Sequence, residues 1–149
     1  MSITYIAEAH VTGGRAEGHA RTSDGQLDVD LRLPKELGGD GLGTNPEQLF
    51  AIGYAGCLAS VLGMVGQRKG LTATDVAIDS RVLLVSGGDG TFTLAVELDI
   101  TLPSVGDAVR AADLVHAAHQ LCPYSRAIRG NVEVALTVNG ERLPQDSAK

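Results

Sequence analysis

Residues 46–69 read PEQLFAIGYAGCLASVLGMVGQRK. Their apolar side chains recur at spacings of three and four, the period of an α-helix; they are Phe50, Tyr54, Cys57, Leu58, Val61, Leu62 and Val65. Thr44 or Asn45 is a suitable N-cap, and Pro46 fits the first helical position because no N–H is needed there. The pattern predicts a long helix that is apolar around much of its circumference and lies centrally in the fold.

Three segments outside this helix alternate apolar and polar residues, which is the pattern of a strand with one buried face. They are residues 27–33 (LDVDLRL), 92–100 (FTLAVELDI) and 131–138 (NVEVALTV). Weaker strand patterns cover residues 3–11 and 76–85, and residues 86–90 (SGGDG) supply turn residues for a hairpin. The sheet is therefore expected to be at least partly antiparallel.

A second helix is expected over residues 104–121, with these residues near one side: Val105, Val109, Leu114 and Val115. Pro123 ends it or starts a new turn. The order of strands and helices predicts an α+β fold in which helices cover one face of a sheet. A chain of 149 residues suffices for one core, so residues 1–149 are expected to form a single domain, with a loosely ordered tail after about residue 140.

Composition narrows the classes of function. The chain is 44% hydrophobic and 20% charged, and no apolar run is expected to approach the roughly 18 residues of a membrane span, which predicts no membrane association. The first residues, MSITYIAEAHV, show no basic segment followed by an apolar one, which favours a cytoplasmic location. A net charge of -6 and the absence of Trp argue against a nucleic-acid partner.

The chain has two cysteines, Cys57 and Cys122. Cysteine pairs in a reducing compartment are usually catalytic or sensing rather than structural. Cys57 lies in the middle of the predicted helix, where the helix dipole hardly favours a thiolate, so it is either an inert buried thiol or a thiol that needs a cation from elsewhere. Cys122 precedes Pro123, where the N–H groups of a following turn favour a thiolate, or it simply closes a helix end. Local electrostatics alone favour Cys122 as the nucleophile.

Metal chemistry has a weaker basis in the sequence. His116 and His119 lie one helical turn apart, but no matching Cys or His pair at zinc-site spacing occurs elsewhere. A structural or solvated role is expected for both histidines, and no metal site is predicted.

Several sequence blocks follow one another along almost the whole chain: residues 12–15 (TGGR), 34–39 (PKELGG), 43–50 (GTNPEQLF), 53–57 (GYAGC), 122–125 (CPYS) and 129–131 (RGN). In this order they resemble the organic hydroperoxide resistance (Ohr) branch of the OsmC/Ohr family. The resemblance implies an OsmC/Ohr-like α+β fold, with largely antiparallel sheets and a long central helix, that forms an intertwined homodimer. It also implies a thiol-dependent peroxidase that reduces alkyl and fatty-acid hydroperoxides to alcohols.

The resemblance assigns roles to four residues and reverses the ranking of the two cysteines. Cys57 is implied to be the peroxidatic residue that becomes a sulfenic acid, and Cys122 the resolving residue that condenses with it into a disulfide. Arg15 is implied to stabilise the Cys57 thiolate, and Glu47 to orient Arg15.

The resemblance also implies the reaction partners. No cofactor is expected to be bound, and the disulfide is expected to be reduced by an external dithiol, either dihydrolipoamide or a lipoylated protein. An apolar pocket formed by Phe50, Leu58 and Leu62 would favour organic hydroperoxides over H2O2.

Helix geometry adds an expectation about assembly. Glu47 and Cys57 are ten positions apart, which is about 15 Å along an unbroken helix and too far for one guanidinium to bridge. Either the helix breaks near Gly53, or Arg15 and Glu47 reach Cys57 from a second subunit. The second alternative is the prediction, a two-fold homodimer with both sites at its interface.

Two other functions compete with this hypothesis. The osmotically inducible OsmC branch shares the two-cysteine chemistry. A redox sensor or a small-ligand-binding protein would use the same pocket without turnover.

Overall fold

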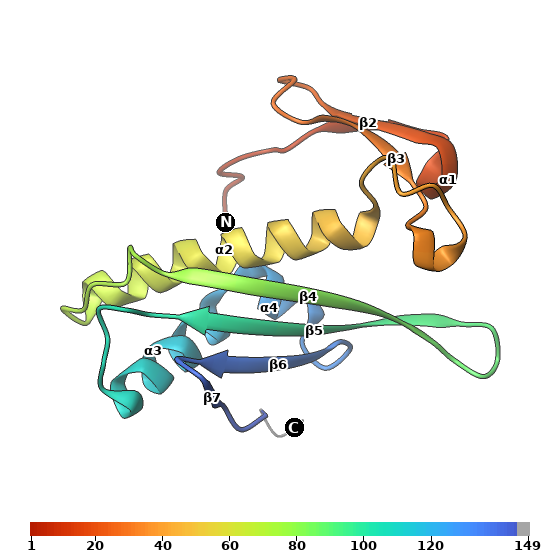
Figure 1. The fold of residues 1–149 in the computed structure, drawn as a ribbon. Helices are drawn as coiled ribbons and strands as arrows, with labels where there is room; N and C mark the ends of the chain where they lie inside the picture. Colours follow the sequence, from red (N-terminus) through yellow and green to blue (C-terminus); the bar gives the residue numbers. More distant parts are fainter. Residues whose placement is uncertain (146–149) are drawn as a thin grey trace. The chain divides into compact units, whose positions relative to one another are not determined.

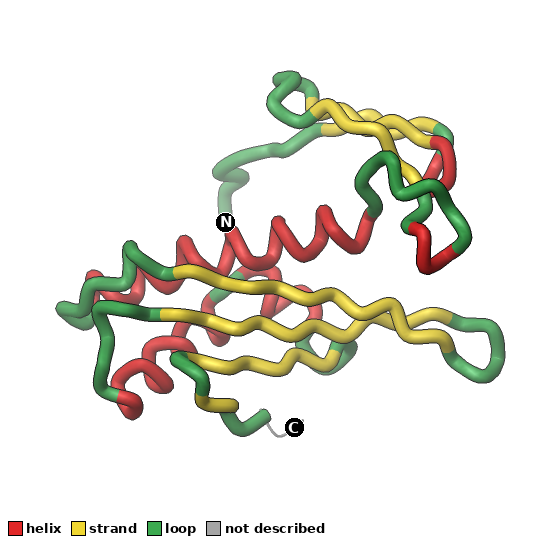
Figure 2. The backbone as a smooth tube through the Cα atoms, in the orientation of Figure 1, coloured by secondary structure: helices red, strands yellow, loops and turns green. Residues whose placement is uncertain are grey.

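The computed structural model describes residues 1–145, and the chain divides into two compact units, residues 1–49 and 50–149 (Figure 1). Helices and strands occur in both units (Figure 2), and the predicted α+β class is confirmed. The expectation of a single domain over residues 1–149 stays a prediction. The end of the predicted loose tail, residues 146–149, lies outside the described residues.

Residues 1–49 hold a three-stranded antiparallel sheet in the order β1-β2-β3. Its elements are β1 (Ala9–Thr12), the single helical turn α1 (Gly14–Glu17), β2 (Gly18–Thr22), β3 (Asp28–Arg32) and the short 3-10 helix η1 (Lys35–Leu37). Strand β3 confirms the alternation in residues 27–33. Strand β1 is shorter than the predicted 3–11. Strand β2, GHART, was not predicted because it carries no run of β-branched or aromatic residues.

Residues 50–149 hold a second sheet in the order β4-β5-β6-β7. Its strands are β4 (Ala77–Ser86), β5 (Phe92–Thr101), β6 (Glu133–Val138) and β7 (Glu141–Arg142). The predicted hairpin joins β4 to β5, whereas β5 and β6 run parallel. A parallel pair needs a long crossover connection, and here the helices α3 (Ala108–Leu121) and α4 (Pro123–Ile128) supply it.

The core of this unit lies between the sheet and the helices on one of its faces (Figure 1). Strand β5 contributes Val96, Leu98 and Ile100, three of the five residues predicted to share its buried face. Phe92, at the hairpin end of the same face, is 63% exposed. Helix α3 buries Leu114 and Val115 as predicted, but it starts later than residue 104 because Asp107 caps it, accepting a hydrogen bond from the Arg110 N–H at 2.8 Å. Val109 is exposed, which corrects its predicted place on the inner side.

The long helix α2 (Pro46–Arg68) closely matches the predicted segment 46–69. Asn45 is its N-cap, since the Asn45 Oδ1 atom accepts a hydrogen bond from the Gln48 N–H at 2.9 Å. The helix ends before Gly70, whose φ of +68° is the left-handed conformation that favours glycine at a C-terminus. Helix α2 is continuous through Gly53, so the alternative of a break near that residue is not observed.

Helix α2 is long enough and apolar enough to cross a membrane, which corrects the expectation that no segment approaches that length. Length and composition alone are weak evidence, because the core helix of a globular protein passes the same test. One side of α2 belongs to the core cluster through Leu58, Leu62 and Val65. This packing is that of a core helix.

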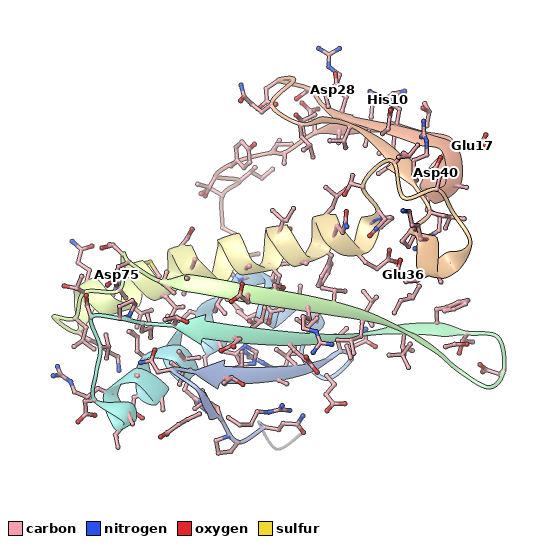
Figure 3. All side chains as sticks on the ribbon, viewed as in Figure 1. His10, Glu17, Asp28, Glu36, Asp40 and Asp75 are labelled. Carbon is pink, nitrogen blue, oxygen red and sulfur yellow. The ribbon has the colours of Figure 1, made fainter. Side chains whose placement is uncertain are left out.

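The chain after Gly140 is better held than predicted up to residue 143. Strand β7 pairs with β6, and Leu143 is buried with its N–H donating to the Leu136 carbonyl at 2.8 Å. Exposed acidic side chains occur on both units (Figure 3), for example Glu17 and Asp28 on the first and Asp75 on the second. Their distribution agrees with the net charge of -6.

Candidate active site

The structure brings the two cysteines together. Cys57 lies on α2 and Cys122 at the junction of α3 and α4, and their Sγ atoms are 3.7 Å apart. Both are free thiols; Cys57 is half-buried and Cys122 is fully buried. Because a disulfide bond is about 2.05 Å long, the two sulfurs need only a small further approach to be linked once one of them has been oxidised.

Cys122 owes its position to the turn between two helices. Its N–H donates to the Ala118 carbonyl at 2.8 Å at the end of α3, and its own carbonyl accepts a hydrogen bond from the Arg126 N–H at 2.9 Å. Pro123 then occupies the first position of α4. The backbone on both sides of Cys122 is therefore fixed.

The groups of residues 50–149 that surround Cys57 do not, on balance, favour its thiolate form. Burial raises the pKa of the Cys57 thiol, and its contact with Cys122 raises it further. The backbone N–H of Tyr124 acts in the opposite direction, since a donor to the sulfur lowers the pKa. A cysteine nucleophile reacts as a thiolate, so the predicted role of Cys57 requires a positive group beyond those that shift its pKa here.

The predicted pair of Arg15 and Glu47 forms within residues 1–49. The Arg15 Nη2 atom lies 2.7 Å from Glu47 Oε1. Arg15 comes from α1 and Glu47 from the first turn of α2, where a carboxylate is favoured by the helix dipole. The ion pair fixes the direction of the guanidinium; its action on a thiolate stays a prediction.

Ser125 links the helices around the two sulfurs. The Ser125 Oγ atom shares hydrogen bonds with Tyr54 Oη at 2.7 Å and with His119 Nδ1 at 2.8 Å. All three residues are buried, and burial raises the pKa of Tyr54 to about 12. The sequence pattern does not reveal this group, because Tyr54 fits the apolar period of the helix and gives no sign of a polar partner. The one available signal was Ser125 in the CPYS block.

Three aromatic rings gather beside the cysteines. Tyr54 and Tyr124 stack with ring centroids 5.8 Å apart, and Phe50 meets Tyr124 edge-on at 5.9 Å. Phe50 is half-buried, and Tyr124 is 38% exposed. An aromatic surface therefore lies near Cys57, whose sulfur also accepts a hydrogen bond from the Tyr124 backbone.

Two of the three predicted pocket residues, Leu58 and Leu62, lie in the hydrophobic core. Leu58 and Leu62 are fully buried in the core cluster, so neither lines an open surface of the chain. They occupy the side of α2 that packs on the sheet, which helical periodicity cannot distinguish from a pocket wall. The pocket assignment therefore stays a prediction for Phe50 alone.

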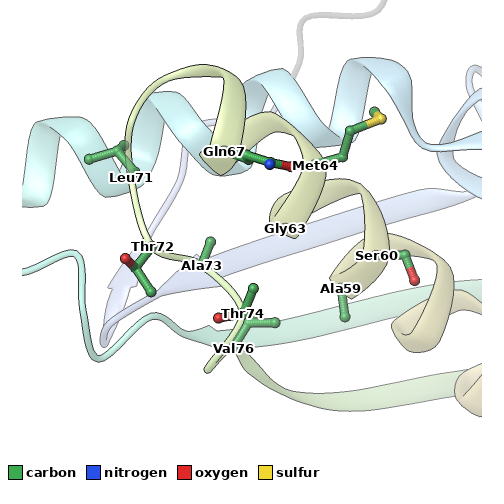
Figure 4. A pocket seen from close by; sticks show the side chains of 10 residues that line it. All are labelled: Ala59, Ser60, Gly63, Met64, Gln67, Leu71, Thr72, Ala73, Thr74 and Val76. Atoms are coloured by element: carbon green, nitrogen blue, oxygen red, sulfur yellow. The ribbon is translucent and has the colours of Figure 1, made fainter.

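A separate groove of about 740 Å³ lies between the second half of α2 and the segment that follows the helix (Figure 4). It is lined by small and polar residues of α2, such as Ser60 and Gly63, and by the segment that follows the helix. Neither cysteine belongs to its lining.

His119 is buried and hydrogen-bonded rather than solvated, whereas His116 is exposed. Among residues 1–145, no group of three or more His, Cys, Asp and Glu side chains is arranged to hold a metal ion.

A half-buried thiol in contact with a buried thiol, on an α+β scaffold with a long core helix, defines a two-cysteine thiol protein. Comparison with known proteins gives the family. The family model described as OsmC-like protein matches residues 38–137, and the chain belongs to this family.

Named relatives agree with this assignment and confirm the resemblance to the Ohr branch. The chain is 47% identical over 140 residues to the organic hydroperoxide resistance protein of Xanthomonas axonopodis pv. citri (strain 306), covering 91% of this chain and 95% of that protein. It is 41% identical over 133 residues to the organic hydroperoxide resistance protein OhrB of Bacillus subtilis (strain 168), covering 89% and 96%.

Solved structures agree as well. The crystal structure of OhrB from Bacillus subtilis matches with a TM-score of 0.82 at 39% identity, covering 92% of this chain and 100% of that one. An organic hydroperoxide resistance protein from Legionella pneumophila matches with a TM-score of 0.86 at 44% identity, covering 92% and 98%. The predicted fold is therefore confirmed at the level of the single chain.

Proposed function

We propose that this chain is a thiol-dependent peroxidase that reduces organic hydroperoxides to alcohols. The observation that carries the proposal is the 3.7 Å separation of the two free sulfurs, with the more accessible one on Cys57. The names of the relatives, organic hydroperoxide resistance proteins, support the substrate class.

The reaction proceeds in three steps. The Cys57 thiolate attacks the O–O bond, which breaks; one oxygen stays on sulfur as a sulfenic acid, and the other leaves with a proton as the alcohol. The Cys122 thiol then displaces the hydroxyl group from Cys57, its proton leaves with that group as water, and a disulfide forms. An external dithiol reduces the disulfide and restores both thiols.

Activation of Cys57 is the role proposed for Arg15 and Glu47. Burial raises the pKa of Cys57, so the thiolate requires a cation that offsets desolvation. Glu47 and Cys57 lie on one unbroken helix, ten positions or about 15 Å apart along its axis. We therefore propose a two-fold, intertwined homodimer in which Arg15 and Glu47 of one subunit serve Cys57 of the other.

The aromatic surface supports the preference for organic substrates. Phe50 and Tyr124 offer apolar contacts to an alkyl or aryl group, which H2O2 cannot use. The proposed reductant is dihydrolipoamide or a lipoylated protein, the proposed location is the cytoplasm, and no bound cofactor, nucleic acid or membrane is required by the chemistry.

Turnover separates the enzyme from its alternatives. Purified protein is supplied with cumene hydroperoxide and dihydrolipoamide, and loss of hydroperoxide is followed over many equivalents. Repeated turnover that disappears in Cys57→Ser supports the peroxidase. A single stoichiometric oxidation supports the redox sensor instead, and an equal rate with H2O2 contradicts the proposed substrate preference.

A further inference from the structure

Three buried side chains near the two sulfurs take no part in the cycle above. Ser125 Oγ lies 2.7 Å from Tyr54 Oη and 2.8 Å from His119 Nδ1. Exposure is 0% for Tyr54, 1% for Ser125 and 9% for His119. One hydroxyl group therefore connects three helices, because Tyr54 belongs to α2, His119 to α3 and Ser125 to α4.

The spacing of these residues from the cysteines is regular. Tyr54 precedes Cys57 by three positions on α2, and His119 precedes Cys122 by three positions at the end of α3. Residues three apart on a helix lie on the same side, about one turn from each other. The two hydrogen bonds thus tie together the backbone segments that carry the sulfurs, one turn from each sulfur.

Further contacts stiffen the same junction. The Arg129 Nη2 group donates to the His119 carbonyl at 3.1 Å, so the residue after α4 is joined to the end of α3. The Tyr54 ring stacks on Tyr124. Cys122 itself is 0% exposed, and its backbone is hydrogen-bonded on both sides. The approach of Cys122 to Cys57 is therefore governed by how the helices are held rather than by free rotation of an exposed side chain.

We propose that Ser125, through its hydrogen bonds to Tyr54 and His119, is a positioning residue for disulfide formation. This inference rests on the peroxidase function proposed above. In this step the Cys122 sulfur bonds to the Cys57 sulfur, the S–O bond of the sulfenic acid breaks, and water leaves. Ser125 exchanges no electrons or atoms; it keeps the attacking sulfur within reach and aligned with the S–O bond.

Positioning of this kind affects the two chemical steps differently. In the attack of Cys57 on the hydroperoxide, Cys122 neither forms nor breaks a bond, so we expect the rate of this step to depend little on the Ser125 hydroxyl. Disulfide formation competes with a second hydroperoxide molecule that oxidises the sulfenic acid to sulfinic acid. Loss of the hydroxyl therefore slows the second step and increases the sulfinic acid fraction.

The test measures both rate constants in full-length protein. Ser125→Ala and Tyr54→Phe each remove one hydroxyl group from the hydrogen-bonded set of Tyr54, Ser125 and His119. Ser60→Ala is the matched control, because the Ser60 hydroxyl donates only to the Gly56 carbonyl on the exposed side of α2. Reduced protein is mixed with one equivalent of cumene hydroperoxide and quenched at intervals. Mass spectrometry then counts sulfenic acid trapped by dimedone and the intramolecular disulfide.

We expect Ser125→Ala to slow disulfide formation by about tenfold to about a hundredfold, with the hydroperoxide step unchanged. Tyr54→Phe should change in the same direction, and Ser60→Ala should match the wild type. The positioning role is overturned if the rate constants of both steps fall in parallel. It is also overturned if Ser125→Ala and Tyr54→Phe form the disulfide at the wild-type rate. A wild-type protein that forms neither sulfenic acid nor disulfide overturns the peroxidase function as well, so the two failures are distinct.

Discussion

The Sγ atom of Cys122 lies 3.7 Å from the Sγ atom of Cys57, although 65 positions separate the two residues in the chain. The more accessible thiol is the one on helix α2, and the fully buried thiol lies behind it. A hydroperoxide arriving from solvent meets Cys57 first, while Cys122 can react only with a group already beside it. This geometry favours the order of roles implied by the family over the order that helix ends alone would give.

The first prediction concerns Cys122→Ser. The hydroperoxide step should survive, because Cys57 is the residue that attacks the hydroperoxide, but no disulfide can form. Excess cumene hydroperoxide should then convert Cys57 to sulfinic acid, and turnover with dihydrolipoamide should fall. Intact mass after graded additions of hydroperoxide measures this. If the variant instead stays at the sulfenic acid stage with full turnover, Cys122 is not required for the cycle.

The second prediction concerns the cation. Arg15→Ala should raise the pKa of Cys57 and slow the hydroperoxide step by about tenfold or more at neutral pH, because a guanidinium beside sulfur favours the thiolate. Thiolate absorbance at 240 nm against pH and single-turnover rates measure the two effects.

Arg21→Ala is the matched control for this prediction. Arg21 is exposed on strand β2, which follows α1, and pairs with Asp28, with Nε 3.6 Å from Oδ2. It should leave the pKa and the rate unchanged. Equal effects of the two substitutions would point to a general loss of positive charge and remove Arg15 from the site.

The main elements of the fold could be predicted where the side-chain period is visible. Helix α2 and strand β5 each bury one side over many residues, so their patterns are long and clear. Strand β2 could not be predicted, because only Gly18 and Ala20 of its five residues are buried and such small residues give little contrast between the two faces of a strand. The parallel pairing of β5 with β6 could not be predicted either, since it depends on the crossover through α3 and α4 rather than on the sequence of either strand.

The third prediction concerns stability at high pH. Burial raises the pKa of Tyr54 from 10.0 to about 12, so the folded protein holds the phenol proton more tightly than the unfolded chain. Its contribution to stability is complete below pH 10 and is lost as the pH rises toward 12, by roughly 3 kcal/mol in total. The free energy of unfolding of Tyr54→Phe should lack this part of the decline. Urea unfolding at pH 9 and pH 11 compares the two proteins.

At neutral pH the same variant should be only modestly destabilised, by about 1 kcal/mol, because Ser125 keeps its hydrogen bond to His119. A wild-type protein and a Tyr54→Phe variant with parallel pH profiles would show that Tyr54 ionises freely in the folded state.

The candidate site was only partly visible in the sequence for a physical reason. The cysteines and the pair of Arg15 and Glu47 were assigned through the family resemblance, since local electrostatics had favoured Cys122. The Tyr54 to Ser125 hydrogen bond spans 71 positions, and nothing in the pattern of either helix signals it. The pocket role of Phe50 stays a prediction, whereas Leu58 and Leu62 have the same periodicity as the core to which they belong.

The fourth prediction concerns sharing of the site between subunits. The protein should sediment as a dimer, and Cys57→Ser and Arg15→Ala should each be nearly inactive alone. When the two are unfolded together in equal amounts and refolded, half of the dimers should be mixed. Each mixed dimer has one complete site, formed by the intact Cys57 of one chain and the intact Arg15 of the other. The mixture should therefore recover about a quarter of the wild-type activity.

The same mixing experiment has a built-in control. Refolding Cys57→Ser with Cys122→Ser tests two residues that contact each other within one chain, so no complete disulfide-forming pair arises in the mixed dimer. Disulfide formation should stay absent in that mixture. Should Cys57→Ser and Arg15→Ala also fail to complement each other, while still forming mixed dimers by mass, Arg15 would have to act within its own chain or not at all, and the shared site would be excluded.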